Sequence, residues 1–440
     1  MADLKKKAVE IVRTLRERGH QALFAGGCVR DMLMNREPAD YDIATDARPE
    51  EVAAIFPITF EVGAQFGVVL VVKDSHAFEV ATFRAEKEYA DHRHPDVVEF
   101  ADAEADVRRR DFTINAMLYD PIEDKLLDLM GGRDDIAARL IRTVGDPNDR
   151  LTEDYLRMAR AVRFAARFDY TIEDSTLEAI RKNAHKINAV SNERIGAEIL
   201  KIFGGPNPHI GLQLLSGTNL LRYILPEVEA MKGVEQPKNF HPEGDVFRHT
   251  LLALEVMGEA RSPEFALAVL LHDVGKPPTF TKTDRIRFSE HDKVGAELAG
   301  GIGRRLRLSN DQIGYINHLV KTHMRFLAVR EMRQSTLRRF LRDPVFDDVL
   351  ELHRLDCLSS HRNLEALEFC EKKLEELGEE RLAPPRLLTG KQLIELGYEP
   401  GPLFKEILSR VEDAQLEDRL HNTEEAIQFV LSEFTQREHE

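Results

Sequence analysis

The chain has 440 residues, and its 77 acidic and 61 basic side chains give a formal net charge of −16. With 42% hydrophobic residues, this length allows about two to four domains with their own cores, and it excludes a disordered chain or a small disulfide scaffold. Three cysteines, Cys28, Cys357 and Cys370, form no CxxC pair and indicate free thiols in a reducing compartment, by default the cytoplasm. Because the apolar stretches are far shorter than a membrane span, we expect neither export nor membrane insertion. The net charge argues weakly against an RNA partner, because RNA would have to be bound by local basic patches.

Hydrophobic periodicity divides the chain into a mixed part and a helical part. Residues 4–18 predict a helix, and short strands are expected at 22–25, 40–44, 67–72 and 78–83. From about residue 152 onward nearly every segment has a helical period, including 153–168, 174–186 and 192–203. Proline and glycine clusters indicate boundaries near 150, 235 and 380. The expected fold class is therefore α+β, with a mixed α/β head over 1–150 followed by all-α regions over 151–235, 236–380 and 381–440.

Two adjacent glycines, Gly26 and Gly27, stand between a predicted strand and a predicted helix. Backbone N–H groups can approach a phosphate closely at such a turn, and Arg30 would add a charged contact. A structural turn uses the same pair of glycines, so this motif alone leaves both interpretations open.

Asp40 and Asp42 flank Tyr41, and alternation along a strand turns both carboxylates to one face. They indicate either a solvated edge strand or a cleft in which cations join the two acids. Paired carboxylates can hold two Mg²⁺ ions that activate a hydroxyl and stabilise a triphosphate, which predicts phosphoryl or nucleotidyl transfer. Glu79 is a candidate third carboxylate. In the arginine cluster 108–110, we expect Arg110 to reach the nucleotide.

Four charged residues recur every third position at the start of the helical part: Asp154, Arg157, Arg160 and Arg163. Most such patterns are solvated salt-bridge faces. The chemistry also allows base recognition, because cytosine and adenine present an amine beside an unprotonated ring nitrogen, whereas uracil and guanine present a carbonyl beside a ring N–H. A carboxylate and a guanidinium would therefore accept C and A and reject U and G.

These motifs occur in the order seen in bacterial class II tRNA nucleotidyltransferases, the CCA-adding enzymes, which the chain resembles over roughly residues 10–235. The segments that carry the resemblance are 26–31, 40–42, 109–116, 153–157 and 193–195, and the tail around 397–402 is also similar to that family. The resemblance implies a nucleotidyltransferase head, a neck for base selection and RNA binding, and a tail that contacts tRNA. It implies that Asp40 and Asp42 bind catalytic metals. The implied nucleotide-binding residues are Gly27, Arg30, Arg110, Asp154, Arg157, Arg160 and Arg163.

Bacterial poly(A) polymerases share most of these motifs but have an arginine-rich segment resembling GRRF, where this chain has residues 63–67, Gly-Ala-Gln-Phe-Gly. Enzymes that add only CC lack a flexible loop after the third strand, whereas residues 84–98 keep a polar stretch here. An enzyme that adds only the terminal A would also keep that loop, so A-only addition stays open.

Histidines gather in the third region, where His272 and Asp273 form an HD doublet within HDVGK. This pattern resembles the HD phosphohydrolase superfamily and implies that His249, His272, Asp273 and Asp356 hold a divalent metal of unknown identity. A metal-activated water at such a site hydrolyses phosphoesters. His291 and His323 are candidates for a second metal or a phosphate.

The expected reaction is template-independent transfer of CMP and AMP from CTP and ATP to the 3′ end of tRNA, with Mg²⁺ at the head. The alternatives are an A-only or poly(A) polymerase, an HD phosphohydrolase with a vestigial head, and a non-catalytic RNA-binding protein. Arginines concentrated in residues 324–342 indicate either a solvated helical face or a contact for the tRNA backbone.

Overall fold

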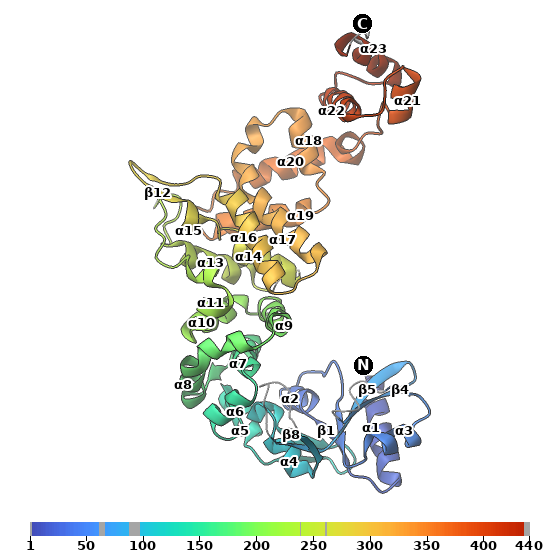
Figure 1. Cartoon of the computed structure of the whole chain (residues 1–440), viewed down its shortest axis with the longest axis vertical. Coiled ribbons are helices and arrows are strands. Elements are labelled where there is room, and N and C mark those ends of the chain that lie inside the picture. Colours follow the sequence, from blue (N-terminus) through green and yellow to red (C-terminus); the bar gives the residue numbers. More distant parts are fainter. Residues whose placement is uncertain (1, 61–66, 88–96, 238, 260–261, 435–440) are drawn as a thin grey trace. The chain divides into compact units, whose positions relative to one another are not determined.

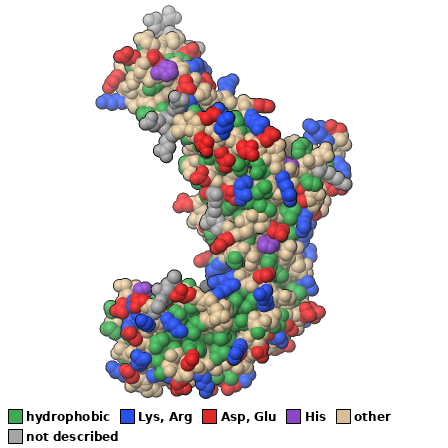
Figure 2. All heavy atoms as spheres, turned by 180° about the vertical axis from the view of Figure 1, so that it is seen from behind, with side chains coloured by type: hydrophobic (Ala, Val, Ile, Leu, Met, Phe, Trp, Pro, Cys, Tyr) green, Lys and Arg blue, Asp and Glu red, His purple; other side chains and the backbone are tan. Residues whose placement is uncertain are grey.

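The computed structural model of the chain describes residues 2–60, 67–87, 97–237, 239–259 and 262–434. These residues belong to two units. The first comprises Met1–Ala230, Gly258–Leu267 and Gly301–Gln312, and the second comprises Met231–Met257, Ala268–Gly300 and Ile313–Glu440. None of the described helices combines the length and the apolar character needed to cross a membrane. Acidic and basic side chains are interspersed on the face shown in Figure 2.

A seven-stranded mixed sheet in the order β3-β4-β5-β2-β1-β8-β9 forms the frame of the first unit (Figure 1). β2 and β5 are parallel, and the other neighbouring strands are antiparallel. The strands are β1 (Ala22–Ala25), β2 (Ile43–Thr45), β3 (Thr59–Phe60), β4 (Val68–Lys73), β5 (His76–Thr82), β8 (Met117–Asp120) and β9 (Lys125–Asp128).

Alternate side chains of the strands fill two hydrophobic cores, one on each face of the sheet. Helices α1 (Ala2–Glu17) and α3 (Pro49–Ile55) pack on one face, where Ile11 and Phe24 belong to the same buried cluster. Helix α4 (Ala103–Arg108) packs on the other face, where Val107 meets Phe83. The helix expected at 4–18 is therefore confirmed, and burial of both faces fixes the register of the central strands.

The remaining elements of the first unit lie mostly after the sheet in the chain. They are α2 (Gly27–Leu33), β6 (Arg84–Lys87), β7 (Val97–Phe100), η2 (Thr113–Asn115), α5 (Gly132–Ala138), β10 (Leu140–Ile141), α6 (Pro147–Glu153), α7 (Leu156–Phe168), β11 (Thr171–Ile172), α8 (Asp174–Asn183), η3 (Ala184–Ala189), α9 (Asn192–Phe203), α10 (Pro208–Gly217), α11 (Leu221–Ile224) and α12 (Pro226–Glu229).

The second unit is almost entirely helical. Its elements are α13 (Val246–Met257), α15 (Lys276–Thr279), β12 (Phe280–Lys282), β13 (Ile286–Phe288), η4 (His323–Glu331), α18 (Gln334–Leu341), α19 (Phe346–Leu358), α20 (Glu365–Leu382), α21 (Gly390–Glu395), α22 (Pro402–Leu416) and α23 (Thr423–Glu433). Three helices have residues in both units: α14 (Pro263–Leu271), α16 (His291–Arg305) and α17 (Asn310–Thr322).

The sequence-based prediction is wrong in three details. The strand expected at 40–44 begins only at Ile43, because its partner β1 ends at Ala25 and the chain turns away at Gly26, whose φ is +69°. The helix expected at 153–168 is broken at Asp154, whose backbone is extended. The helical part also contains three short strands: β11, which pairs with β10 of the head, and the pair β12 and β13.

Most arginines in residues 324–342 are paired within the second unit, although Arg330 and Arg333 are exposed. Arg338 is only 2% exposed and pairs with Asp418 at 2.8 Å. Arg339 pairs with Glu412 at 2.8 Å and also with Asp413. Because these carboxylates lie in or just after α22, the arginines join α18 to the tail, and their charge is largely neutralised within the second unit.

Replacing Arg339 by glutamate should weaken the packing of α22 against α18, because it sets a third carboxylate beside Glu412 and Asp413. We expect faster hydrogen exchange of the α22 amides and a lower melting temperature. Arg333→Glu is the matched control. Arg333 directly precedes α18, is exposed, and forms no ion pair with the described residues. Equal exchange rates in the two variants would contradict this role of Arg339.

Candidate active site and histidine cluster

A polar cavity of about 1080 Å³ opens beside the sheet of the first unit. We call it the head cavity. It is lined by ten arginine and lysine side chains and six carboxylates, so it is locally cationic in a chain of net charge −16. All ten residues predicted for catalysis and nucleotide binding line it: Gly27, Arg30, Asp40, Asp42, Glu79, Arg110, Asp154, Arg157, Arg160 and Arg163.

The glycine turn allows an arginine to approach the backbone. A Cβ atom on Gly26 would lie 2.8 Å from Nη1 of Arg110. The positive φ of Gly26 also disfavours any other residue at this position. Arg30 follows on α2, is 5% exposed, and donates from Nη1 to Oδ1 of Asn115 at 2.7 Å. Its guanidinium also lies over the ring of Phe168 at 4.8 Å. The turn therefore brings two fixed guanidinium groups to one end of the cavity.

Asp40 and Asp42 reach the head cavity from the extended segment that leads into β2. Tyr41 between them is buried and packs on Phe24, with ring centroids 5.1 Å apart, so the two carboxylates face the opposite way. Burial and repulsion by Asp40 and then Glu79 raise the pKa of Asp42 to about 6. Glu79 extends into the same cavity from β5. Three carboxylates thus line one cavity and the charges of Asp40 and Glu79 act on Asp42, a repulsion that a hard divalent cation would relieve.

The three arginines at 108–110 point in different directions, one toward solvent and two into the head cavity. Arg108 pairs with Glu104 on the exposed face of α4, whereas Arg109 and Arg110 line the cavity and share the buried Asp106, at 2.6 and 2.9 Å. Burial favours the neutral acid, but the two arginines outweigh it and lower the pKa of Asp106. Asp106 therefore stays ionised and holds Arg110 toward the glycine turn.

Asp154 and Arg157 lie where α6 ends and α7 begins. Asp154 accepts two hydrogen bonds from Arg194, at 2.7 and 3.2 Å, and a third from the backbone N–H of Leu156. Arg157 donates to Glu153 and to the backbone oxygen of Arg150. A carboxylate has about four lone-pair sites, so Asp154 is fixed in orientation and can still accept from a base amine.

The other two arginines of the stripe have buried carboxylate partners. Arg160 donates twice to Asp111, at 2.6 and 2.8 Å, and Arg163 pairs with Glu198 at 2.7 Å. Burial opposes ionisation of Asp111, but Arg160 lowers its pKa to about 2. The sequence analysis did not identify Asp111, Arg194 and Glu198 as part of the site. The motif 193–195 contains Arg194, but nothing in the sequence shows that it faces Asp154.

Two segments weighed in the sequence analysis fall outside the described part of the chain. Residues 63–66, in place of the arginine-rich segment of poly(A) polymerases, are not described, and neither are residues 88–96 of the polar loop. The distinctions from poly(A) polymerases and from enzymes that add only CC therefore rest on the sequence alone.

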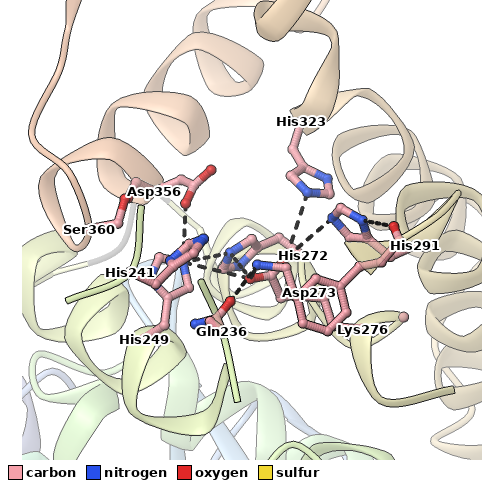
Figure 3. Close-up of polar contacts among 12 residues, drawn as sticks. Gln236, His241, His249, His272, Asp273, Lys276, His291, His323, Asp356 and Ser360 are labelled. Carbon is pink, nitrogen blue, oxygen red and sulfur yellow. Dashed lines mark hydrogen bonds and ion pairs between the residues drawn. The ribbon is translucent and has the colours of Figure 1, made fainter. Parts of the chain in front are cut away.

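Eight histidine and carboxylate side chains gather in the second unit, and we call them the histidine cluster (Figure 3). His249, His272 and Asp356 form one group of potential metal ligands, and Asp273, His291 and His323 form another, each with ligand atoms within 4.8 Å of one another. Glu243 belongs to a further group with His249 and His241. Nε2 of His249 is 3.2 Å from Nε2 of His272 and 3.1 Å from Oδ1 of Asp356. The four ligands expected from the HD doublet are thus close together, and His291 and His323 lie next to Asp273.

Backbone carbonyls orient three of these histidines in the same way. Nδ1 of His272, His291 and His323 lies 2.8, 2.9 and 2.6 Å from the carbonyl oxygen of the residue three positions earlier. If Nδ1 donates, each Nε2 keeps a lone pair toward the cluster, which is the usual arrangement of metal-binding histidines. Nε2 of both His291 and His323 has no hydrogen-bond partner among the described residues although it is buried. These features fit a divalent metal.

The charges in the cluster are consistent with such a site. Burial lowers the pKa of His323 to about 4, so this ring is neutral and able to act as a ligand at pH 7. Burial also opposes protonation of His249, but hydrogen bonds to Asp356 and Glu243 outweigh it and raise its pKa to about 9. A metal at His249 would therefore displace a proton near neutral pH.

Comparisons with known proteins match most of the chain. Family models match as "Poly A polymerase head domain" over residues 22–142, "Probable RNA and SrmB- binding site of polymerase A" over 169–232, "HD domain" over 246–343 and a tRNA nucleotidyltransferase domain 2 over 297–430.

Curated relatives named CCA-adding enzyme match over different lengths. One from Geobacillus sp. (strain WCH70) is 46% identical over 220 residues, which is 50% of this chain, so the chain spans about half (54%) of that relative's length. One from Bacillus cytotoxicus is 31% identical over 97% of this chain and 98% of the relative. The solved structure of the Bacillus stearothermophilus CCA-adding enzyme in complex with CTP has a TM-score of 0.74 and 29% identity, and the match covers 97% of this chain and 96% of that one.

Replacing Asp42 by asparagine should stabilise the metal-free protein at neutral pH. Because folding raises the pKa of Asp42 from 3.8 to about 6, the folded state holds this proton more tightly than the unfolded state, and stability is lost as the pH rises between these values. A pKa shift of this size lowers the free energy of unfolding by at most about 3 kcal/mol above pH 6.

In EDTA at pH 7.5, Asp42→Asn should melt at a higher temperature than the wild type, and the difference should shrink toward pH 4. Mg²⁺ should raise the melting temperature of the wild type more than that of the variant. A lower melting temperature for the variant at pH 7.5 would contradict the carboxylate repulsion inferred here.

Proposed function

The chain belongs to the CCA-adding enzyme family, and we propose that it adds CMP and AMP from CTP and ATP to the 3′ end of tRNA. The observation that carries this proposal is the head cavity, in which the pair Asp40 and Asp42 faces the same space as Asp154 and Arg157. The pair Asp40 and Asp42 suits the triphosphate chemistry, and the pair Asp154 and Arg157 suits base selection. We propose the cytoplasm as its compartment, in keeping with three buried, unpaired cysteines.

The proposed reaction is a nucleotidyl transfer. The 3′ hydroxyl of the tRNA attacks the α-phosphorus of the nucleotide, a new O–P bond forms, the bond to the β-phosphate oxygen breaks, and pyrophosphate leaves while the hydroxyl proton is lost. Arg30 and Arg110 would bind the triphosphate beside the glycine turn. Their fixed positions support the transition-state charge without rearrangement.

We propose that Asp40 and Asp42 hold Mg²⁺, and Glu79 remains a candidate third ligand. Mg²⁺ would supply activation of the attacking hydroxyl and neutralisation of the leaving phosphates. The raised pKa of Asp42 supports this assignment, because a divalent cation would relieve the repulsion that raises it.

Base choice is proposed to depend on Asp154 and Arg157. Asp154 would accept from the exocyclic amine of C or A, and Arg157 would donate to the adjacent ring nitrogen. We assign Arg160 and Arg163 to the rim of this pocket, held by Asp111 and Glu198. The neck at 151–235 and the tail at 381–440 are proposed to bind the tRNA, and the match to an RNA-binding model over 169–232 supports the first of these.

The direct test incubates the protein with tRNA lacking CCA and with each nucleotide separately. We expect incorporation of CMP first, and of AMP only after two C residues are present. Asp42→Asn should reduce the rate by at least about a thousandfold without loss of fold, because it removes a metal ligand. Incorporation near the wild-type rate in this variant would contradict the assigned role of Asp42.

Asp154→Ala should relax base choice more than it weakens triphosphate binding, because this carboxylate is proposed to read the amine. The ratio of kcat/KM for CTP to that for UTP should fall by about tenfold or more, since a polar group built to pair with the base is lost. Asp149→Ala, which removes an exposed carboxylate of the same helix, is the comparison that leaves both Asp154 and Arg157 in place. If UTP and GTP were rejected as strictly as by the wild type, the base-reading role of Asp154 would be wrong.

We propose a second activity, metal-dependent phosphoester hydrolysis, for the histidine cluster. It is supported by the buried, unpartnered Nε2 atoms of His291 and His323 beside Asp273. A bound divalent metal would lower the pKa of a water molecule and polarise the phosphoester. The expected result is release of inorganic phosphate from glycerol 2-phosphate with Mn²⁺ or Ni²⁺, abolished by His272→Ala and unaffected by Asp42→Asn. Release unchanged in His272→Ala would exclude the cluster as its source.

A further inference from the structure

Asn115 lies between the charged groups that line the head cavity. Among the described residues that line this cavity, it is the one uncharged polar side chain, and it is only 8% exposed. It ends the short helix η2, where its backbone N–H donates to the carbonyl oxygen of the buried Phe112 at 3.0 Å. The core of the head therefore fixes the place of Asn115 before any substrate binds.

Asn115 forms hydrogen bonds to three charged side chains of the cavity. Its Oδ1 accepts from Nη1 of Arg30 at 2.7 Å, and its backbone oxygen accepts from Nη1 of Arg110 at 3.3 Å. Its Nδ2 donates to Oδ1 of Asp111 at 3.2 Å. Both arginines that are proposed to bind the triphosphate thus share one hydrogen-bonding partner.

The amide of Asn115 suits neighbours of opposite charge. A guanidinium only donates and a carboxylate only accepts, so the amide must turn its oxygen to Arg30 and its nitrogen to Asp111. A carboxylate at position 115 would repel Asp111, and a cationic side chain would repel Arg30. The two contacts therefore fix the orientation of the amide.

The contacts of Asn115 continue to α7, the helix that carries Arg157. The other carboxylate oxygen of Asp111 accepts from Nε and Nη2 of Arg160 on this helix, at 2.8 and 2.6 Å. The guanidinium of Arg30 lies 4.8 Å from the centre of the Phe168 ring at the end of the same helix. A chain of hydrogen bonds thus joins the triphosphate end of the cavity to the base pocket, and a satisfied buried chain of this kind specifies one geometry.

We propose that Asn115 is a positioning residue for nucleotide transfer: its amide holds Arg30 toward the triphosphate and links this arginine, through Asp111, to Arg160. The inference rests on the nucleotidyl transfer proposed above and adds a residue that acts through Arg30 rather than on the substrate itself. A guanidinium that is already oriented binds the triphosphate without a further ordering cost. In Asn115→Ala, Nη1 of Arg30 would lose its acceptor, while the ion pair between Arg30 and Asp31 at 2.7 Å would remain.

Inorganic triphosphate with Mg²⁺ is the probe, because it has no base and reports the phosphate end of the cavity alone. Calorimetric titration of the full chain should give a dissociation constant about tenfold higher for Asn115→Ala than for the wild type, since a hydrogen bond to a charged group is lost. Asn148→Ala is the matched control, because Asn148 is exposed on α6 and does not line the cavity. A dissociation constant of Asn115→Ala equal to that of the wild type would overturn the inference.

A second variant covers the case in which Asn115→Ala does not fold. Asn115→Gln keeps the amide but displaces it by one methylene, so it should also weaken the binding of inorganic triphosphate. Wild-type affinity in the folded Asn115→Gln variant would then overturn the inference.

A double-mutant cycle separates positioning from direct contact with the phosphates. Truncation of Asn115 leaves its backbone oxygen, and hence the contact with Arg110, in place. Asn115→Ala should therefore have almost no effect on triphosphate binding in the Arg30→Ala background. The same tenfold loss in that background would overturn the role of Asn115 through Arg30.

Nucleotide transfer is measured separately, with tRNA lacking CCA. Asn115→Ala should raise KM for CTP and for ATP alike, by about tenfold, because the triphosphate is common to both. An unchanged KM for both nucleotides would contradict the positioning role. No incorporation by the wild type would refute the proposed function, whereas the binding of inorganic triphosphate would still decide the role of Asn115.

Discussion

Ion pairs with other carboxylates fix three arginines of the head cavity in place. Arg110 is fixed by Asp106 and Arg160 by Asp111, while Arg163 is fixed by Glu198. Buried ion pairs contribute little net stability because desolvation costs about as much as the attraction returns, so their effect here is on geometry. Since these cations are already engaged, Asp40 and Asp42 retain their mutual repulsion and the cavity keeps a place for a divalent cation. A cavity organised in this way presents both signs of charge before any substrate arrives.

The fold and the site differ in how much of each the sequence could predict. Short apolar runs predicted β1, β4 and β5 to within two residues, since burial on both faces of the sheet favours apolar side chains along a strand. The strand around Asp40 was predicted too long, because its end depends on where the partner strand turns away. The break at Asp154 was missed because it depends on Arg194, whose side chain lies 40 positions later in the chain.

Charge pairing between residues far apart in the chain explains the other differences between the sequence-based prediction and the structure. The arginines of residues 324–342 carry an excess of positive charge in the sequence. The partners of Arg338, Arg339 and Arg342 stand 70 to 80 positions away, so the sequence alone does not show that these arginines hold the tail. The histidine cluster was easier to anticipate, because the HD doublet is a local pattern. What the sequence did not show is that backbone carbonyls orient His272, His291 and His323 alike.

The central claim is that the head cavity adds C and A, in that order, and then stops. It is tested most directly by sequencing the 3′ ends of tRNA lacking CCA after incubation with the protein and all four nucleotides together. We predict that nearly all extended molecules end in CCA, with neither U nor G incorporated. A tail of many A residues, a single A added only to tRNA that already ends in CC, or no extension at all would contradict the account.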